Sequence, residues 1–310
     1  MSLTINHQTN DISNATGTIL VNGVAVGGDN SPVWYGSRGV FGGGSVPNTN
    51  VIEYVTIANT GNATDFGDLT VTRAGLASCS NGSRGLFAGG QNTSNTATNV
   101  IDYITVANTG NATDFGNLTV TRRYRVAGCS NGTRGVFGGG FQTNVIDYVT
   151  IANTGNATDF GDLTATRYNI ASCADETYGL WLGGNSSNVI DYVTIATTAN
   201  AQDFGDLLST QAGGAACSSR TRGVYGGAGS NVLQYVTIAT PGNAVDFGDL
   251  NNSVQYLGAC ANVSRGLFAG GTTGSASNVI DYITMDTTGN ATDFGDLTVA
   301  RLNLAGLSGT

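Results

Sequence analysis

The sequence lacks lysine: all 12 basic residues among its 310 are arginine, against 21 acidic residues, for a formal net charge of -9. Neutralising phosphates requires a basic footprint, so this balance disfavours binding to nucleic acid or to an anionic membrane surface. No apolar run approaches the length of a membrane span. The first residues also lack the charged start and apolar stretch of a secretory signal. We therefore expect no membrane insertion, and synthesis in a cytoplasm.

Histidine is almost absent. The one copy, His7, precedes the region of repeats described below. The rest of the chain therefore has no His-based metal site and no Ser-His-Asp or Cys-His arrangement. We expect no metal, no cofactor and no enzymatic activity, although a glycosidase that uses carboxylates alone stays open as an alternative.

The five cysteines are an odd number, and each stands five residues before a recurring Arg-Gly or Tyr-Gly pair. Leu307 takes the sixth equivalent place. A position that accepts Cys or Leu is typical of a small buried apolar site and not of a disulfide framework or a zinc site. The cysteines are Cys79, Cys129, Cys173, Cys217 and Cys260.

A phrase of about ten residues recurs every 43 to 50 residues from Arg38 onward. A period of this length indicates a stacked or circular repeat. Each repeat divides into four strand-like runs, which in the second copy cover residues 76–80, 84–88, 100–106 and 114–120. Four strands in 43 to 50 residues is the size of a propeller blade. The phrase begins at Arg38, Arg84, Arg134, Tyr178, Arg222 and Arg265.

The two ends of the repeat region complement each other. Residues 301–310 reproduce only the first strand and turn of a repeat, and the copy that begins at Ser37 lacks that first strand. If the last strand completes the first blade, no sheet edge is left open at the closure. The sequence therefore predicts an all-β, six-bladed β-propeller over residues 37–310, preceded by an N-terminal segment, residues 1–36.

The repeats resemble the kelch family of β-propellers. The likeness lies in a small apolar strand, an apolar strand ending in Gly-Gly, a strand with Tyr and an aromatic on the last strand. The family's fourth-strand Trp is Phe throughout this chain. The resemblance implies that the first strand of each blade lies at the central channel. The aromatics on the last strand are Phe66, Phe115, Phe160, Phe204, Phe247 and Phe294.

The polar residues that recur have structural explanations. Asn and Asp of the Asn-Ala-Thr-Asp-Phe-Gly turn can bond backbone amides, although calcium binding there remains an alternative. Arg84 and Asp102 lie on consecutive strands, and we expect a partly buried ion pair. The alternative to these ion pairs is that the arginines of the repeats form a ring that binds a ligand. The same pairing is expected for Arg38 with Glu53, Arg134 with Asp147 and Arg265 with Asp281, whereas Arg222 faces Gln234.

Function is expected where the copies differ. In a four-stranded meander, the loops from strand two to three and the linkers from strand four to the next blade emerge on one face, and variable loops on a rigid scaffold are where binding is usually built. The linkers are rich in Arg and Tyr, which suit sugar rings, carboxylates or a protein partner. The linker at residues 122–125 has one extra residue. The candidate ligand-binding residues are Arg122, Arg123, Tyr124, Arg125, Tyr168, Asn169, Gln255 and Tyr256.

The N-terminal segment carries a hairpin signal, in which Asn22-Gly23 separates two apolar runs. Residues 3–28 resemble N-terminal segments of bacteriophage tail-fibre and appendage proteins. This resemblance implies an anchor, residues 1–36, that binds other virion proteins or sister subunits in a homo-oligomer. The leading hypothesis is a non-enzymatic virion structural protein that binds a host-surface glycan or receptor protein. The alternatives are an intracellular kelch-type adaptor and a carbohydrate-active propeller enzyme.

Overall fold

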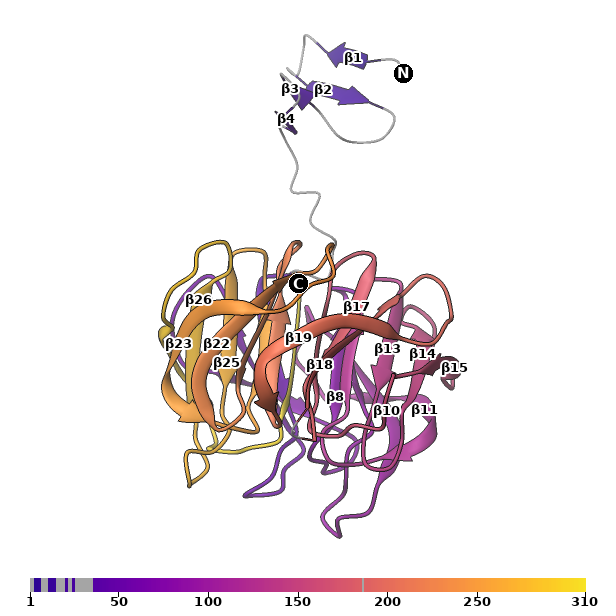
Figure 1. Ribbon diagram of the computed structural model, residues 1–310, viewed down its shortest axis with the longest axis vertical. Coiled ribbons are helices and arrows are strands. Elements are labelled where there is room, and N and C mark those ends of the chain that lie inside the picture. Colours follow the sequence, from indigo (N-terminus) through magenta and orange to yellow (C-terminus); the bar gives the residue numbers. More distant parts are fainter. Residues whose placement is uncertain (1–2, 7–10, 15–19, 22–23, 26–35, 186) are drawn as a thin grey trace. The chain divides into compact units, whose positions relative to one another are not determined.

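The computed structural model describes residues 3–6, 11–14, 20–21, 24–25, 36–185 and 187–310. The chain divides into two compact units, Met1–Pro32 and Val33–Thr310. Every described element is a β-strand, and no described helix could cross a membrane. Figure 1 shows the strands of both units.

The first unit contains two antiparallel strand pairs. The predicted hairpin is present, with Leu20 opposite Ala25 and Val21 opposite Val24, while its Asn22-Gly23 turn lies outside the described residues. A second pair, with Leu3 opposite Asn14, was not predicted. The strands are β1 (Leu3–Asn6), β2 (Asp11–Asn14), β3 (Leu20–Val21) and β4 (Val24–Ala25).

The second unit is a β-propeller of six four-stranded antiparallel blades, which confirms the predicted fold class. Blade 1 has the order β28-β5-β6-β7, and blades 2 to 6 follow as β8-β11, β12-β15, β16-β19, β20-β23 and β24-β27. The strands of blades 1 to 3 are β28 (Ala305–Gly309), β5 (Arg38–Gly42), β6 (Val51–Thr56), β7 (Thr64–Asp68), β8 (Ala77–Ser80), β9 (Arg84–Ala88), β10 (Thr98–Thr105), β11 (Thr113–Arg122), β12 (Ala127–Ser130), β13 (Arg134–Gly138), β14 (Val145–Thr150) and β15 (Thr158–Asp162). Those of blades 4 to 6 are β16 (Ala171–Ala174), β17 (Tyr178–Leu182), β18 (Ser187–Thr194), β19 (Gln202–Gln211), β20 (Gly214–Ser218), β21 (Arg222–Gly227), β22 (Ser230–Thr237), β23 (Val245–Val254), β24 (Gly258–Ala261), β25 (Arg265–Ala269), β26 (Val279–Thr284) and β27 (Thr292–Asp296).

The ring is closed by the C-terminal strand, as predicted. β28 pairs antiparallel with β5, from Ala305 opposite Gly42 to Gly309 opposite Arg38. The first strands of the blades contact each other in a circle, in which β28 lies between β24 and β8. The first strands therefore surround the central axis, and blade 1 is built from the two ends of the repeat region.

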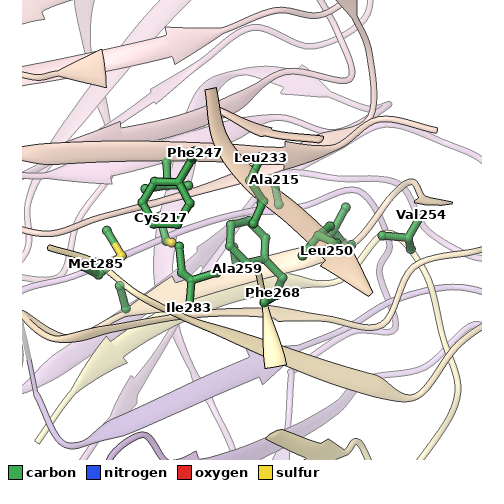
Figure 2. Close-up of a cluster of buried hydrophobic side chains, with 14 residues drawn as sticks. Ala215, Cys217, Leu233, Phe247, Leu250, Val254, Ala259, Phe268, Ile283 and Met285 are labelled. Atoms are coloured by element: carbon green, nitrogen blue, oxygen red, sulfur yellow. The ribbon is translucent and has the colours of Figure 1, made fainter. Parts of the chain in front are cut away.

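Apolar side chains hold neighbouring blades together. Each of six buried clusters combines residues of two adjacent blades, and Figure 2 shows the one between blades 5 and 6, where Cys217 and Phe247 meet Phe268 and Met285. The Phe of each fourth strand lies in such a cluster, edge-on to the Tyr of its own third strand. The Phe of the fourth strand therefore packs at the interface between blades.

The buried cysteines explain why glycine follows arginine in the recurring Arg-Gly phrase. All five are free and buried, as predicted. A Cβ added to Gly135 would lie 2.6 Å from Sγ of Cys79, one blade back, and the same relation joins every cysteine to the next blade's phrase. At the sixth interface, a Cβ added to Gly85 would lie 2.8 Å from a methyl group of Leu307. Glycine at this place lets two blades approach closely.

The predicted ion pairs within blades are wrong. The register places Asp102 opposite Phe87 and Arg84 opposite Thr105, so the two side chains lie three positions apart. Arg84 instead donates to the carbonyls of Ile151 and Ala152 in blade 3, at 2.9 Å each, and its guanidinium lies 4.5 Å from the ring centre of Tyr103. Arg38, Arg134 and Arg265 likewise donate to carbonyls of the next blade around the ring, and each lies over the Tyr of its own blade.

The carboxylates pair with arginines of the preceding blade. Nη2 of Arg73, after β7, lies 2.7 Å from Oδ2 of Asp102, and both side chains are fully buried. Nη1 of the same Arg73 donates to the carbonyls of Gly89 and Val100. Each pair therefore ties the end of one blade into the next blade. The other pairs are Arg122 with Asp147, Arg167 with Asp191 and Arg301 with Glu53.

Two interfaces lack the arginine. Between blades 4 and 5, Gln211 and Gln234 take the places of Arg and Asp. Between blades 5 and 6, Val254 takes the place of Arg, and Asp281 is left with the side-chain amide of Asn251 at 2.7 Å. Burial raises the pKa of Asp281, and its two hydrogen bonds from Asn251 oppose that rise. The carboxylate at this interface therefore has no arginine opposite it.

The Asn of the recurrent turn also bonds between blades. Asn111 Oδ1, for example, accepts the backbone N–H of Asp68 in blade 1 at 3.0 Å, and each of the five other turns makes the equivalent bond. The expected bond to a backbone amide is present, but the amide belongs to the preceding blade and not to the turn itself. The recurring Asn therefore has a structural role at each blade interface.

Candidate functional site

Among the described residues, the propeller axis contains small cavities and one larger cavity. The first strands line two small ones, of about 90 and 60 Å³. The third, of about 450 Å³, is formed by the linkers that join each fourth strand to the next blade, and we call it the linker cavity. A volume of this size suits a small ligand.

The linker cavity is framed by a closed ring of backbone hydrogen bonds. The N–H of each linker bonds a carbonyl of the linker before it: Gly75 to Asn303, Val126 to Gly75, Asn169 to Tyr124, Gly213 to Asn169, Tyr256 to Gly213 and Asn303 to Tyr256. Every linker contains a residue with positive φ, between 55° and 82°. Gly and Asn tolerate this conformation, and four linkers use them. The exceptions, Tyr124 with Arg125 and Tyr256, are the linkers with the largest side chains.

Rings, amides and one cation line the linker cavity. The rings belong to Tyr124, Tyr168 and Tyr256, and the cation is Arg125. The amide side chains are those of Gln91, Asn169 and Asn303, and the remaining lining residue is Gly75. None of these residues is acidic. Partly buried aromatic rings beside planar amides can hold a flat polar ligand by stacking and hydrogen bonding.

One side of the cavity is an aromatic group. The ring of Tyr124 lies 5.3 Å from that of Phe141 and 5.9 Å from that of Tyr168. Phe141 and Tyr168 are 5.6 Å apart. Arg123 covers this group from outside, with its guanidinium 4.7 Å from the centre of Tyr124 and 4.8 Å from that of Phe141. These contacts hold the rings in fixed orientations.

Arg125 spans the centre of the ring of linkers. Its Nη2 donates to the carbonyl oxygens of Gly214 at 3.0 Å and Leu257 at 2.8 Å, which belong to the far blades 5 and 6. Arg125 also lines the small cavity on the other side, along the first strands. It therefore separates the linker cavity from the rest of the axis.

The structure brings together five of the eight residues that the sequence singled out: Tyr124, Arg125, Tyr168, Asn169 and Tyr256 line one cavity. Arg123 lies behind the aromatic group. Gln255 is absent from the lining, and its backbone pairs with Thr272. Arg122 lies outside the cavity because its side chain is fully buried in the ion pair with Asp147.

Sequence reasoning left out Gln91, Asn303 and Phe141. Gln91 and Phe141 begin loops between strands two and three, and backbone bonds of Gln91 to Ala74 and of Phe141 to Arg123 bring these loops beside the linkers. Asn303 lies in the linker that joins β27 to β28. Its equivalence with Asn169, four residues before the cysteine position, was the available signal.

The linker cavity offers groups that bind a ligand by stacking and hydrogen bonding. The lining of the linker cavity contains no carboxylate, histidine or thiol. The thiols near the axis are unreactive in character, because burial raises the pKa of all five, that of Cys173 to about 12. Within the described part of the chain, no three His, Cys, Asp or Glu side chains are grouped to hold a metal ion.

Comparison with models of known protein families gives no match, and comparison with curated proteins gives none either. The six-bladed architecture is therefore established by the structure itself, and the likeness of the repeats to the kelch family stays a resemblance.

Proposed function

We propose that this protein is a non-catalytic binding protein whose linker cavity holds a glycan of a host cell surface. The observation that carries the proposal is the composition of that cavity, in which three tyrosine rings and three amide side chains surround about 450 Å³. Sugars are commonly bound by aromatic faces that cover their apolar C–H surface and by amides that bond their hydroxyl groups. The rigid ring of linkers presents these groups with little ordering cost.

The proposal includes display on a virion, such as a tail fibre or another surface appendage. Its support is the resemblance of residues 3–28 to the N-terminal segments of phage appendage proteins. In this proposal, residues 1–36 bind other virion proteins or sister subunits, and residues 37–310 face the host. A protein made in the host cytoplasm and assembled there needs no secretion signal.

Glycan-array binding by the full chain tests the proposal. We expect bound glycans to be lost in Tyr168→Ala, since this removes one ring of the cavity wall. Tyr256→Asn should weaken binding and keep the fold, because Asn169 and Asn303 occupy the equivalent place in other linkers. Thr133→Ala, an exposed turn position between β12 and β13 at the other ends of the strands, is the matched control. Equal binding by all variants would contradict the proposal.

Attachment is tested separately. Electron microscopy of particles from the source, with an antibody against residues 37–310, should label the surface of the virion. A chain that lacks residues 1–28 should still fold and bind glycans but fail to incorporate into particles. Label confined to host cytoplasm would exclude the virion part and leave the glycan site to be judged by the array.

A further inference from the structure

Five buried arginines can be compared within this one fold. Four of them, Arg73, Arg122, Arg167 and Arg301, each have a carboxylate partner in the next blade. The fifth, Arg125, is 8% exposed and has no ion pair with any described residue. Burying a charge without a counter-charge is costly. Arg125 is therefore the one of these five buried arginines that has no carboxylate partner.

The extra residue of this linker places Arg125 at the cavity. In the other linkers, one residue both donates and accepts in the ring of backbone bonds. Here Tyr124 accepts and Val126 donates, so Arg125 stands between them, outside the ring. Its φ is 57° and that of Tyr124 is 60°, a conformation that costs free energy for side chains of this size. Such strain is characteristic of binding sites.

Donors of Arg125 remain unused. Nη2 is occupied by two carbonyl oxygens, whereas Nε and Nη1 are buried and have no acceptor within the described structure. Burial lowers the pKa of Arg125 to about 10, with Tyr225 and Tyr256 opposing the decrease, so the guanidinium is charged at neutral pH. The guanidinium of Arg125 lies 5.9 Å from the centre of the Tyr256 ring. The side chain is held in place by two carbonyls, and no carboxylate of the described residues forms an ion pair with it.

We propose that the linker cavity takes an acidic saccharide, and that Arg125 binds the carboxylate of its sugar acid. This rests on the proposed glycan site and adds its chemical class. The carboxylate accepts from Nη1, a charge-assisted bond that neutralises the buried cation. The sugar ring lies against the tyrosines, and its hydroxyl groups bond the amides of Asn169 and Asn303. The net charge of -9 repels anionic ligands from the rest of the protein surface, so the buried Arg125 favours their binding in the linker cavity.

Matched pairs of oligosaccharides test the proposal: glucose with glucuronate, galactose with galacturonate, and lactose with and without a terminal sialic acid. Titration calorimetry with the full chain should show that at least one carboxylated member binds about 10- to 100-fold more tightly than its neutral partner, the range expected for a hydrogen bond to a charged group. Acetylated diglycine, a carboxylate without a sugar, should bind far more weakly.

Two variants assign the preference to Arg125. Arg125→Gln should abolish the difference between acidic and neutral members, and deletion of Arg125, which restores the length of the other five linkers, should do the same. Arg123→Gln, in the same linker, should keep the preference. Should Arg125→Gln unfold, the deletion and the wild-type comparison still decide. Equal binding of acidic and neutral sugars would overturn the inference of an acidic ligand and leave the proposed glycan site standing. Tight binding of acetylated diglycine would show that the site recognises a carboxylate without a sugar, which overturns the saccharide part of the inference. Absence of any saccharide binding would overturn the proposed function as well.

Discussion

Replacing Val254 with arginine should stabilise the propeller. A cavity of about 20 Å³ lies between blades 5 and 6, lined among others by Val254, Gly270, Val279 and Asp281. Gly270, Val279 and Asp281 are equivalent to Gly89, Val100 and Asp102 of blade 2. There, Arg73 donates to the carbonyls of Gly89 and Val100 and pairs with the carboxylate of Asp102. The interface therefore presents the acceptors of the missing arginine, and Val254→Arg supplies the donor.

The size of the effect follows from two opposing changes. Leaving one member of a buried ion pair without its partner costs about 3–5 kcal/mol, and the lower end applies because Asp281 already accepts two bonds from Asn251. Loss of the buried valine side chain costs about 1.5 kcal/mol. A gain of about 1.5 kcal/mol remains, which raises the melting temperature by about 3–6 °C for a domain of this size.

The gain should depend on pH in a defined direction. Burial raises the folded-state pKa of Asp281, so the proton that it binds stabilises the fold at low pH, and this contribution is lost as the pH rises through that pKa. An arginine at position 254 pairs with the ionised form only. The advantage of Val254→Arg is therefore full at pH 7 and smallest at pH 3, below the ordinary aspartate pKa of about 3.9.

Urea unfolding of the wild type and the variant at pH 7 and pH 3 measures both effects. Val254→Gln is the control, because Gln211 occupies the equivalent place between blades 4 and 5. If Val254→Arg were less stable than Val254→Gln at pH 7, or if its advantage grew at pH 3, the reasoning from the ion pairs would be refuted.

Three further predictions concern the interfaces and the closure. Asp191→Ala should lower the free energy of unfolding by about 3–5 kcal/mol, and adding Arg167→Met should recover part of it in a double-mutant cycle; additivity would exclude a coupled pair. Gly135→Ala should cost about 1–3 kcal/mol by overpacking against Cys79, and Cys79→Ala should relieve it, as read by thermal unfolding. Removing residues 305–310 should leave the edge of β5 unpaired and yield aggregates on size-exclusion chromatography, whereas a monomer of unchanged stability would argue against closure by β28.

The architecture was accessible from the sequence because each of its determinants is local and repeated. The apolar residues that identify a strand such as Arg84–Ala88 lie within five consecutive positions, and an equivalent segment occurs in each of the six repeats. The predicted strands of blade 2 differ from the observed ones only at their ends, as for β10 and β11, which are longer than expected.

The ion pairs could not be predicted from the sequence in the same way, because they depend on which residues of neighbouring blades face each other. Arg84 and Asp102 are near in sequence, yet the register separates them by three positions. A signal was present: the one interface where the acidic position is a glutamine, Gln234, is also the one where the preceding blade ends in Gln211. Reading this joint change would have pointed to the linker residue, and not to the Arg-Gly phrase, as the partner.

Repetition gives the candidate site its internal controls. In a protein without repeats, a buried arginine such as Arg125 could be attributed to packing, because nothing defines what a structural arginine looks like in that fold. Here Arg73, Arg122 and Arg167 define it: each stands five residues after the Asp or Asn that follows the Phe-Gly of the fourth strand, pairs with a carboxylate and donates to carbonyls of the next blade. Arg125 shares the burial but lacks the carboxylate, and the insertion that carries it occurs once. The missing carboxylate partner and the single insertion are the two features of Arg125 that the proposed acidic ligand explains and that the repeated blade interface does not.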